Sequence, residues 1–228
     1  MQQIGQDVWV VESPLRFIGL EVGARMTIVR LESGRLFVHS PIAATPDLLQ
    51  AARSLGEIAF LVAPSCFHHL FVGDWKKAFP DSALFVAPGL ERKRSDLDIA
   101  GILSDTPESG WAGSIDQVVL RGIPATNEVV FFHRPSRTLI ASDLAFNLGQ
   151  ESPGLTRLVF RMLGAHGRLA PTVFERLLVR DRAAFRRSLQ QVLAWPFERV
   201  VIAHGGISEE GGRESLIRGY AWILKGAR

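Results

Sequence analysis

The stretch Ile58-Ala-Phe-Leu-Val-Ala63 runs directly into Pro64-Ser-Cys-Phe-His-His69, so an apolar segment leads to a pair of adjacent histidines. The apolar half has the length and the residue types of a buried strand. The proline and serine that follow it are typical of a loop. The histidines therefore lie just beyond a strand end, which is where layered α/β folds place ligand-binding groups.

Two other apolar runs end next to a polar residue in the same way. Residues 137–142 (RTLIAS) precede Asp143, and residues 199–203 (RVVIA) precede His204. Three strand ends at one rim of a sheet would bring imidazoles and a carboxylate together, and such a set suits one divalent metal ion. The predicted metal ligands are His68, His69, Asp143 and His204.

Strand-like and helix-like segments alternate along the rest of the chain. Thr45-Pro46-Asp47 supplies an N-cap, a proline at the first helical position and an acidic first turn. The expected strands are residues 8–11, 25–30, 35–40, 58–63, 83–87, 117–120, 128–133, 138–141 and 199–203. The expected helices are residues 46–55, 69–79, 154–164, 181–194 and 208–224. Two β-rich stretches, each followed by helices, predict an α/β (α+β) protein with two mixed sheets face to face and helices outside, a four-layered αββα sandwich. We expect residues 1–228 to form one domain.

The composition excludes several classes of protein. With 228 residues and 47% hydrophobic content, the chain can bury a full core. It starts MQQIGQDVWVV, without a basic segment ahead of an apolar one, and no uninterrupted run of about 18 apolar residues occurs. We therefore predict no export, no membrane insertion and a cytoplasmic location. The lone Cys66 excludes an internal disulfide and fits a reducing compartment.

The net charge of +3 is unevenly spread, because residues 155–187 carry eight arginines against only Glu175 and Asp181. Solvated helix faces are one interpretation of this segment. An anionic substrate, a nucleic acid or a membrane surface remain alternatives. The segment lacks interleaved aromatic residues and a helix-turn-helix pattern, so we predict no nucleic-acid partner. A small-molecule substrate, anionic if the arginines contact it, is the expected partner.

The order of elements and the positions of the four predicted ligands resemble the metallo-β-lactamase superfamily over nearly the whole chain. That family carries an H-x-H-x-D-H motif after a strand, and the matching stretch here is residues 64–69. His69 stands at the last histidine of the motif and His68 at its aspartate. Pro64 and Cys66 replace the first two histidines.

Later positions extend the resemblance. Pro124 stands where the family's G-H-T turn has a metal-binding histidine, whereas Asp143 and His204 match its G-D and G-H-G strand ends. Family members often bind two metals, and each protein ligand peculiar to the first metal is replaced here. The resemblance therefore implies an αββα fold with a mononuclear site at His68, His69, Asp143 and His204. It also implies a degenerate, double-histidine branch of the superfamily, with Asp143 in the catalytic position.

Imidazoles and a carboxylate suit zinc, and iron or manganese would also be accepted. A metal with one open position activates water, so the expected activity is hydrolysis of a small ester, thioester or phosphoester. Two alternatives remain: a binding or interaction module with a vestigial metal site, and an iron-dependent oxidoreductase. Side chains of adjacent residues point to opposite sides in an extended chain, so His68 and His69 reach one ion only if the backbone turns between them.

Two further residues are candidate accessories. Cys66 would be a substitute ligand or a nucleophile if its thiolate were stabilised, and otherwise a small buried hydrophobe. His39 ends the strand at residues 35–40, where the family often carries an aspartate that orients metal ligands. It would then act through hydrogen bonds behind the ligands, and a core histidine is the other interpretation.

Overall fold

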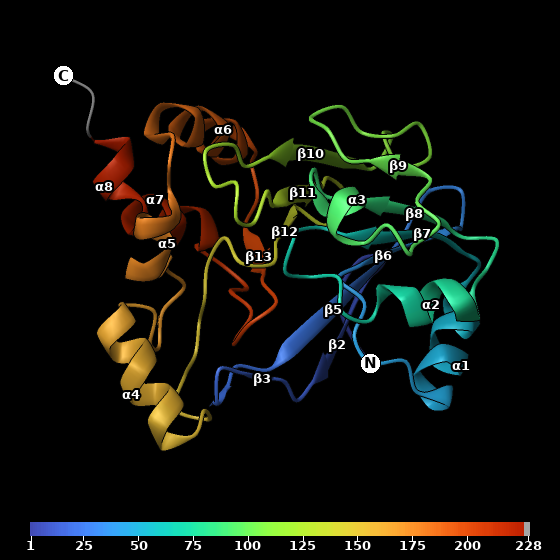
Figure 1. Ribbon diagram of the computed structural model, residues 1–228, viewed down its shortest axis with the longest axis horizontal. Helices are drawn as coiled ribbons and strands as arrows, with labels where there is room; N and C mark the ends of the chain where they lie inside the picture. The colour runs from blue at the N-terminus through green and yellow to red at the C-terminus, as the bar shows by residue number, and fades with distance from the viewer. Residues whose placement is uncertain (226–228) are drawn as a thin grey trace.

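The computed structural model describes residues 1–225, and two large sheets face each other at its centre (Figure 1). The first sheet contains β1 (Gln2–Gly5), β2 (Val8–Ser13), β5 (Ala24–Arg30), β6 (Leu36–His39), β7 (Ile58–Ala63), β8 (Ala83–Val86) and β9 (Gly101–Ile102), in that spatial order. The second contains β10 (Ile115–Val119), β11 (Val129–His133), β12 (Thr138–Ile140) and β13 (Arg199–Val201). A small hairpin is made by β3 (Arg16–Phe17) and β4 (Leu20–Glu21).

Both large sheets are mixed, as the sequence predicts. In the first, β1, β2, β5 and β6 pair antiparallel, and β6 through β9 pair parallel. In the second, β10, β11 and β12 pair antiparallel, whereas β12 and β13 are parallel. The carboxyl ends of the parallel pairs β6–β7 and β12–β13 each lie at one edge of their sheet, and the chain leaves those ends through the loops that carry the predicted ligands.

Aromatic side chains fill the space between the two sheets. Phe37 of β6 contacts Phe131 of β11 edge-on, with ring centroids 5.3 Å apart. Trp111 packs edge-on against Phe37 at 5.2 Å and is buried. Alternate residues of the same strands, such as Val38 next to Phe37, point to the opposite face, where they pack under helices.

Helices cover the two outer faces. The first sheet is covered by α1 (Pro46–Leu55), α2 (Val72–Ala78) and α3 (Leu90–Lys93). The second is covered by α6 (Arg182–Ala194), α7 (Gly212–Gly219) and α8 (Ala221–Leu224). Two more helices, α4 (Gly154–Leu163) and α5 (Val173–Leu178), lie at the periphery (Figure 1). The four-layered αββα prediction is thereby confirmed.

The helix predicted over residues 208–224 is wrong at its start and its middle. Ser208 pairs with Val200 through two backbone hydrogen bonds, so the chain is still extended there. α7 begins at Gly212 because Gly211 takes a left-handed conformation at φ +64°. Tyr220 separates α7 from α8. Within residues 1–225, no helix has both the length and the apolar character that a membrane span requires.

Candidate functional site

Three of the four predicted ligands meet where strands of the two sheets end. His68 follows β7, Asp143 follows β12 and His204 follows β13. The Nε2 atoms of His68 and His204 lie 3.3 and 3.5 Å from the same oxygen, Oδ1 of Asp143. Each residue offers a ligand atom within 4.8 Å of those of the other two. The structure therefore assembles two imidazoles and one carboxylate around one point.

Serine hydroxyls orient His68. Ser40, the residue that follows β6, forms a 2.8 Å hydrogen bond between its Oγ and Nδ1 of His68. Ser65 accepts hydrogen bonds from the backbone N–H groups of Phe67 and His68 at 3.2 and 3.1 Å. Such side-chain to backbone bonds stabilise a turn. This turn directs the His68 ring, through Nε2, toward Asp143.

A backbone carbonyl fixes the tautomer of His204. The Nδ1 atom lies 2.7 Å from the carbonyl oxygen of Gly23, and a carbonyl only accepts, so Nδ1 carries the proton. In the neutral ring, Nε2 then presents a lone pair toward Oδ1 of Asp143. Phe146 stacks on the other side of the ring at 5.4 Å and 7°. In that tautomer, Nε2 is the ring nitrogen that can bind a cation beside the carboxylate.

The backbone at Asp143 is held in place by a second buried carboxyl group, that of Glu128. Glu128 accepts hydrogen bonds at its Oε1 from the backbone N–H groups of Ser142 (2.6 Å) and Asp143 (3.1 Å). Burial, followed by the negative charge of Asp143, raises the pKa of Glu128. Burial alone would raise the pKa of Asp143, but the contacts with His68 and His204 hold it well below its usual range. Oδ2 of Asp143 is buried and has no hydrogen-bond partner among the described residues.

The loop that carries His204 is fastened to the first sheet by a buried arginine. Arg25 of β5 donates from Nη1 to the carbonyl oxygen of Ile202 and from Nη2 to that of Gly205, the latter at 2.5 Å. Its Nη2 also contacts Oε1 of Glu12. Gly205 has φ +90°, and a Cβ there would lie 2.2 Å from the carbonyl oxygen of Asn147. Arg25 therefore fixes the backbone before and after His204, and position 205 requires glycine.

His69 is not part of the three-residue group. Its Nδ1 accepts a hydrogen bond from Nη1 of Arg94 at 3.2 Å, and the same Nη1 donates to the His69 carbonyl oxygen at 3.2 Å. Burial lowers the pKa of His69, and the positive charges of Lys93 and Arg94 lower it further. A guanidinium group in contact with the ring opposes the approach of a cation. His68 therefore contacts Asp143, whereas His69 contacts Arg94.

The two candidate accessory residues also have other surroundings. Sγ of Cys66 donates to the carbonyl oxygen of Pro88 at 3.6 Å, and burial raises the pKa of its thiol. His39 is buried edge-on against Phe131, with centroids 5.5 Å apart, and burial together with the nearby His68 lowers its pKa to about 3. The hydrogen bond to a site histidine that we expected from His39 is made by its neighbour Ser40.

Four supporting residues escaped the sequence interpretation: Gly23, Arg25, Ser40 and Glu128. For two of them, the sequence contained a feature that could have pointed to the site. Glu128 is a carboxyl group at the head of the apolar run 129–132, and Arg25 opens another buried strand, so each is a charge where burial is expected. Gly23 acts through its carbonyl group, which no sequence pattern reveals.

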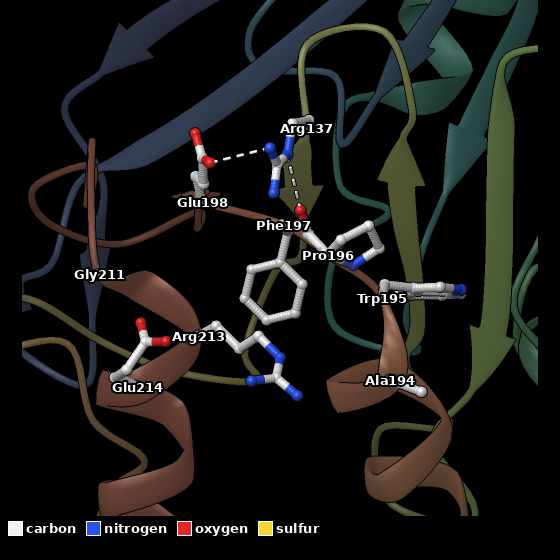
Figure 2. Close-up of a pocket in the computed structure, with 9 residues that line it drawn as sticks. All are labelled: Arg137, Ala194, Trp195, Pro196, Phe197, Glu198, Gly211, Arg213 and Glu214. Carbon is white, nitrogen blue, oxygen red and sulfur yellow. Dashed lines mark hydrogen bonds and ion pairs between the residues drawn. The ribbon is translucent and has the colours of Figure 1, made fainter.

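A cavity of about 390 Å³ lies at the opposite end of β12 and β13, away from the three residues. Figure 2 shows it between the turn before β12, the end of α6 and the start of α7. Arg137 is already paired there with Glu198 at 3.0 Å and with the carbonyl oxygen of Pro196 at 3.0 Å. Arg213 donates from Nε to the carbonyl oxygen of Leu193 at 2.8 Å.

The three residues fit a single divalent ion. Two nitrogen donors and one carboxylate match the ligand types that zinc, iron and manganese accept. Oδ2 of Asp143 is buried and has no hydrogen-bond partner among residues 1–225. Buried polar atoms are nearly always satisfied, and a cation bound by the three residues would satisfy this one.

Solved structures show the same fold. The metallo-β-lactamase from Pontibacter korlensis matches with a TM-score of 0.67 at 14% identity, covering 99% of this chain and 98% of that one. The metallo-β-lactamase from Hirschia baltica matches with a TM-score of 0.63 at 12% identity, covering 98% and 96%. The metal-soaked Flv1 flavodiiron core from Synechocystis sp. PCC6803 matches with a TM-score of 0.66 at 12% identity, covering 97% of this chain and 59% of that one.

Comparison of sequences finds fewer relatives than comparison of structures. No curated protein sequence matches the chain. One family model, described as a domain of unknown function (DUF4336), matches residues 5–168, which is well over half of the chain. The chain therefore belongs to the DUF4336 family, and its fold is that of the metallo-β-lactamases.

Proposed function

We propose that this protein is a metal-dependent hydrolase with a mononuclear site, in which His68, Asp143 and His204 hold one divalent ion. The observation that carries the proposal is the convergence of the Nε2 atoms of His68 and His204 on Oδ1 of Asp143, whose Oδ2 is buried without a hydrogen-bond partner among residues 1–225. These three side chains offer two nitrogen ligands and one carboxylate to a single ion. Zinc is our first expectation because nitrogen-rich sites bind it tightly, and iron and manganese suit the same donors.

Three protein ligands leave a coordination position open, as in catalytic rather than structural zinc sites. A divalent ion held there would supply Lewis acidity and activate a water molecule for attack on a carbonyl or phosphoryl group. The chain's own contribution is orientation. Ser40 and Gly23 fix the two imidazole rings, and Glu128 fixes the loop of Asp143.

The site favours a small reacting group. The side chains of His68, Asp143 and His204 are only 10, 17 and 9% exposed. A bulky substrate could reach these recessed atoms only if its reacting group were at a narrow end of the molecule. We therefore expect an ester, thioester or phosphoester whose scissile bond lies at an accessible end.

Metal content is the first test. The protein is purified without chelators, and metal per chain is measured for the wild type, Asp143→Ala and His204→Ala. We expect about one equivalent in the wild type and a large loss in both variants. Asp116→Ala is the matched control, since that aspartate pairs with Arg134 at the surface of β10. Metal-free wild type that stays empty after incubation with zinc, iron(II) and manganese would overturn the proposal.

Activity is tested next, with the loaded protein against p-nitrophenyl acetate, an acyl thioester and bis(p-nitrophenyl) phosphate. Turnover that disappears in Asp143→Ala and persists in Asp116→Ala supports hydrolysis. His69→Ala tests the fourth ligand predicted from sequence. Unchanged metal content in this variant would mean that His69 binds Arg94 and not the metal. Iron as the resident metal, with redox activity and no hydrolysis, would instead support the oxidoreductase alternative.

A non-catalytic binding module is the second candidate. It is favoured by Pro64, Cys66 and Pro124, which stand where the family resemblance places ligands of a first metal. Proline side chains offer no donor atom. A wild type that stays metal-free after incubation with zinc, iron(II) and manganese, and turns over none of the substrate classes, would support this candidate.

A further inference from the structure

Helix α4 exposes apolar side chains that no described element covers. Thr156 and Phe160 face inward and are buried, as expected for a helix packed against the protein. Leu155, Leu158 and Met162 are nevertheless each more than half exposed. Their spacing of three and four residues places them on one face of the helix. α4 is therefore apolar on its outward side as well as its inward one.

Helix α5 continues this surface. Thr172 caps it, and Glu175 is its buried residue. Val173, Phe174 and Leu177 are exposed, the last two by more than half. The hairpin β3–β4 lies beside α4, with a hydrogen bond from Glu21 N–H to Thr156 Oγ1, and it exposes Phe17 and Ile18. Figure 1 shows α4, α5 and this hairpin on one side of the molecule, outside the two sheets.

Arginines surround the apolar residues without acidic partners. A cavity of about 280 Å³ lies between the end of α4, α5 and α7, and Arg168, Arg176 and Arg218 line it together with apolar and small residues but no carboxylate. Arg157 and Arg161 of α4 add to the same region, and none of these five arginines makes an ion pair among residues 1–225. Burial raises the pKa of Glu175 well above its usual value, so that carboxyl group does not offset them.

We propose that α4 and α5 form a peripheral docking surface for an anionic phospholipid membrane. The apolar side chains would enter the interface between headgroups and acyl chains, and the cavity of three arginines would receive a lipid phosphate. A second copy of the chain fits less well, because a symmetric contact through this surface would bring arginines against arginines. No membrane span is needed for this mode of binding.

The surface is tested by co-sedimentation with vesicles of phosphatidylcholine alone and of equal parts phosphatidylcholine and phosphatidylglycerol. We expect the protein to bind only the anionic vesicles, and more weakly at high salt. Arg168→Gln/Arg176→Gln/Arg218→Gln should lower partitioning about a hundred-fold, since each arginine near an anionic surface contributes roughly a factor of five. Leu158→Glu/Met162→Glu should lower it at least about ten-fold.

Matched controls lie on the first sheet and its helices. Ile102→Glu and Arg92→Gln change an exposed apolar residue and an exposed arginine elsewhere, and should bind like the wild type. Circular dichroism and the unfolding midpoint establish that each variant is folded. Equal binding by wild type and Leu158→Glu/Met162→Glu, or no binding to anionic vesicles, would overturn the proposal. Inorganic phosphate binding without vesicle binding, or a dimer lost in Leu158→Glu/Met162→Glu, would replace it with a free-anion site or a self-association surface.

Discussion

The replacement Asp143→Asn tests the metal site most directly, because it keeps the shape of the side chain and removes its negative charge. In the wild type, Oδ1 lies 3.3 and 3.5 Å from the Nε2 atoms of His68 and His204, and Oδ2 has no hydrogen-bond partner among residues 1–225. A bound cation satisfies both carboxylate oxygens and the lone pair of His204. An amide supplies one neutral oxygen and directs an N–H toward the same point. We therefore expect the variant to fold and to bind metal much more weakly.

The magnitude follows from binding linkage. A ligand that binds only the native state stabilises it by RT ln(1 + [L]/Kd), which is about 2.7 kcal/mol at a metal concentration of 100 times Kd. For a chain of 228 residues this corresponds to a rise in Tm of roughly 5–11 °C. If Asp143→Asn weakens binding about a hundred-fold, the same metal concentration stabilises it by only about 0.4 kcal/mol, and its Tm rises by roughly 1–2 °C.

The assay is thermal unfolding followed by fluorescence, with chelator-treated protein titrated with zinc and, in parallel, manganese. Asp116→Asn, at the surface of β10, is the control and should shift like the wild type. A wild type whose Tm ignores every metal would refute the reasoning. So would an Asp143→Asn variant whose Tm rises as much as that of the wild type, because the carboxylate would then contribute nothing to binding.

Three further predictions concern other parts of the molecule. Ser40→Ala removes the hydrogen bond to Nδ1 of His68 and should weaken metal binding about 10–100-fold with little loss of stability, measured by competition with a chromogenic chelator. Gly205→Ala should destabilise the protein by about 1–3 kcal/mol from its φ of +90° alone, with a further loss from the clash with Asn147, measured by urea unfolding. Burial lowers the pKa of His133 from 6.5 to about 4, so the unfolded chain takes up a proton first as the pH falls. About 3 kcal/mol of stability should therefore be present above pH 6.5 and lost progressively toward pH 4; if His133→Asn retains the same pH dependence of urea unfolding, this assignment is wrong.

Local signals predicted some elements to the residue. The helix over residues 46–55 and the strand over 58–63 are observed with those bounds, because Thr45 caps the helix, Pro46 starts it and Gly56 ends it. α5 was missed because six residues are too short to show a helical period. The final helix was overextended because a glycine pair at 211–212 delays its start. Short elements and glycine-controlled boundaries depend on tertiary contacts that the pattern does not encode.

The site shows the same division. His68, Asp143 and His204 follow three apolar strands, and the neighbouring strand ends of the two facing sheets bring them together. The separation of His68 from His69 depends on the turn set by Ser65 and on the contact with Arg94, which is 25 residues further along the chain. The Gly23 carbonyl lies 181 residues from its partner His204. Such contacts are decided by how the sheets face each other, so no local pattern predicts them.

The hydrogen bonds of His204 also bear on the choice between a working and a vestigial site. An imidazole that no longer serves a ligand would satisfy both nitrogens within the protein, and a carboxylate freed of a metal would find donors for both oxygens. Here Gly23 takes the Nδ1 proton, and Nε2 faces a carboxylate oxygen. Oδ2 of Asp143 is buried without a donor among residues 1–225. A cation between the three residues would satisfy both atoms at once, and the buried Arg25 holds the same loop in place. These contacts favour the proposed metal site over a vestigial one.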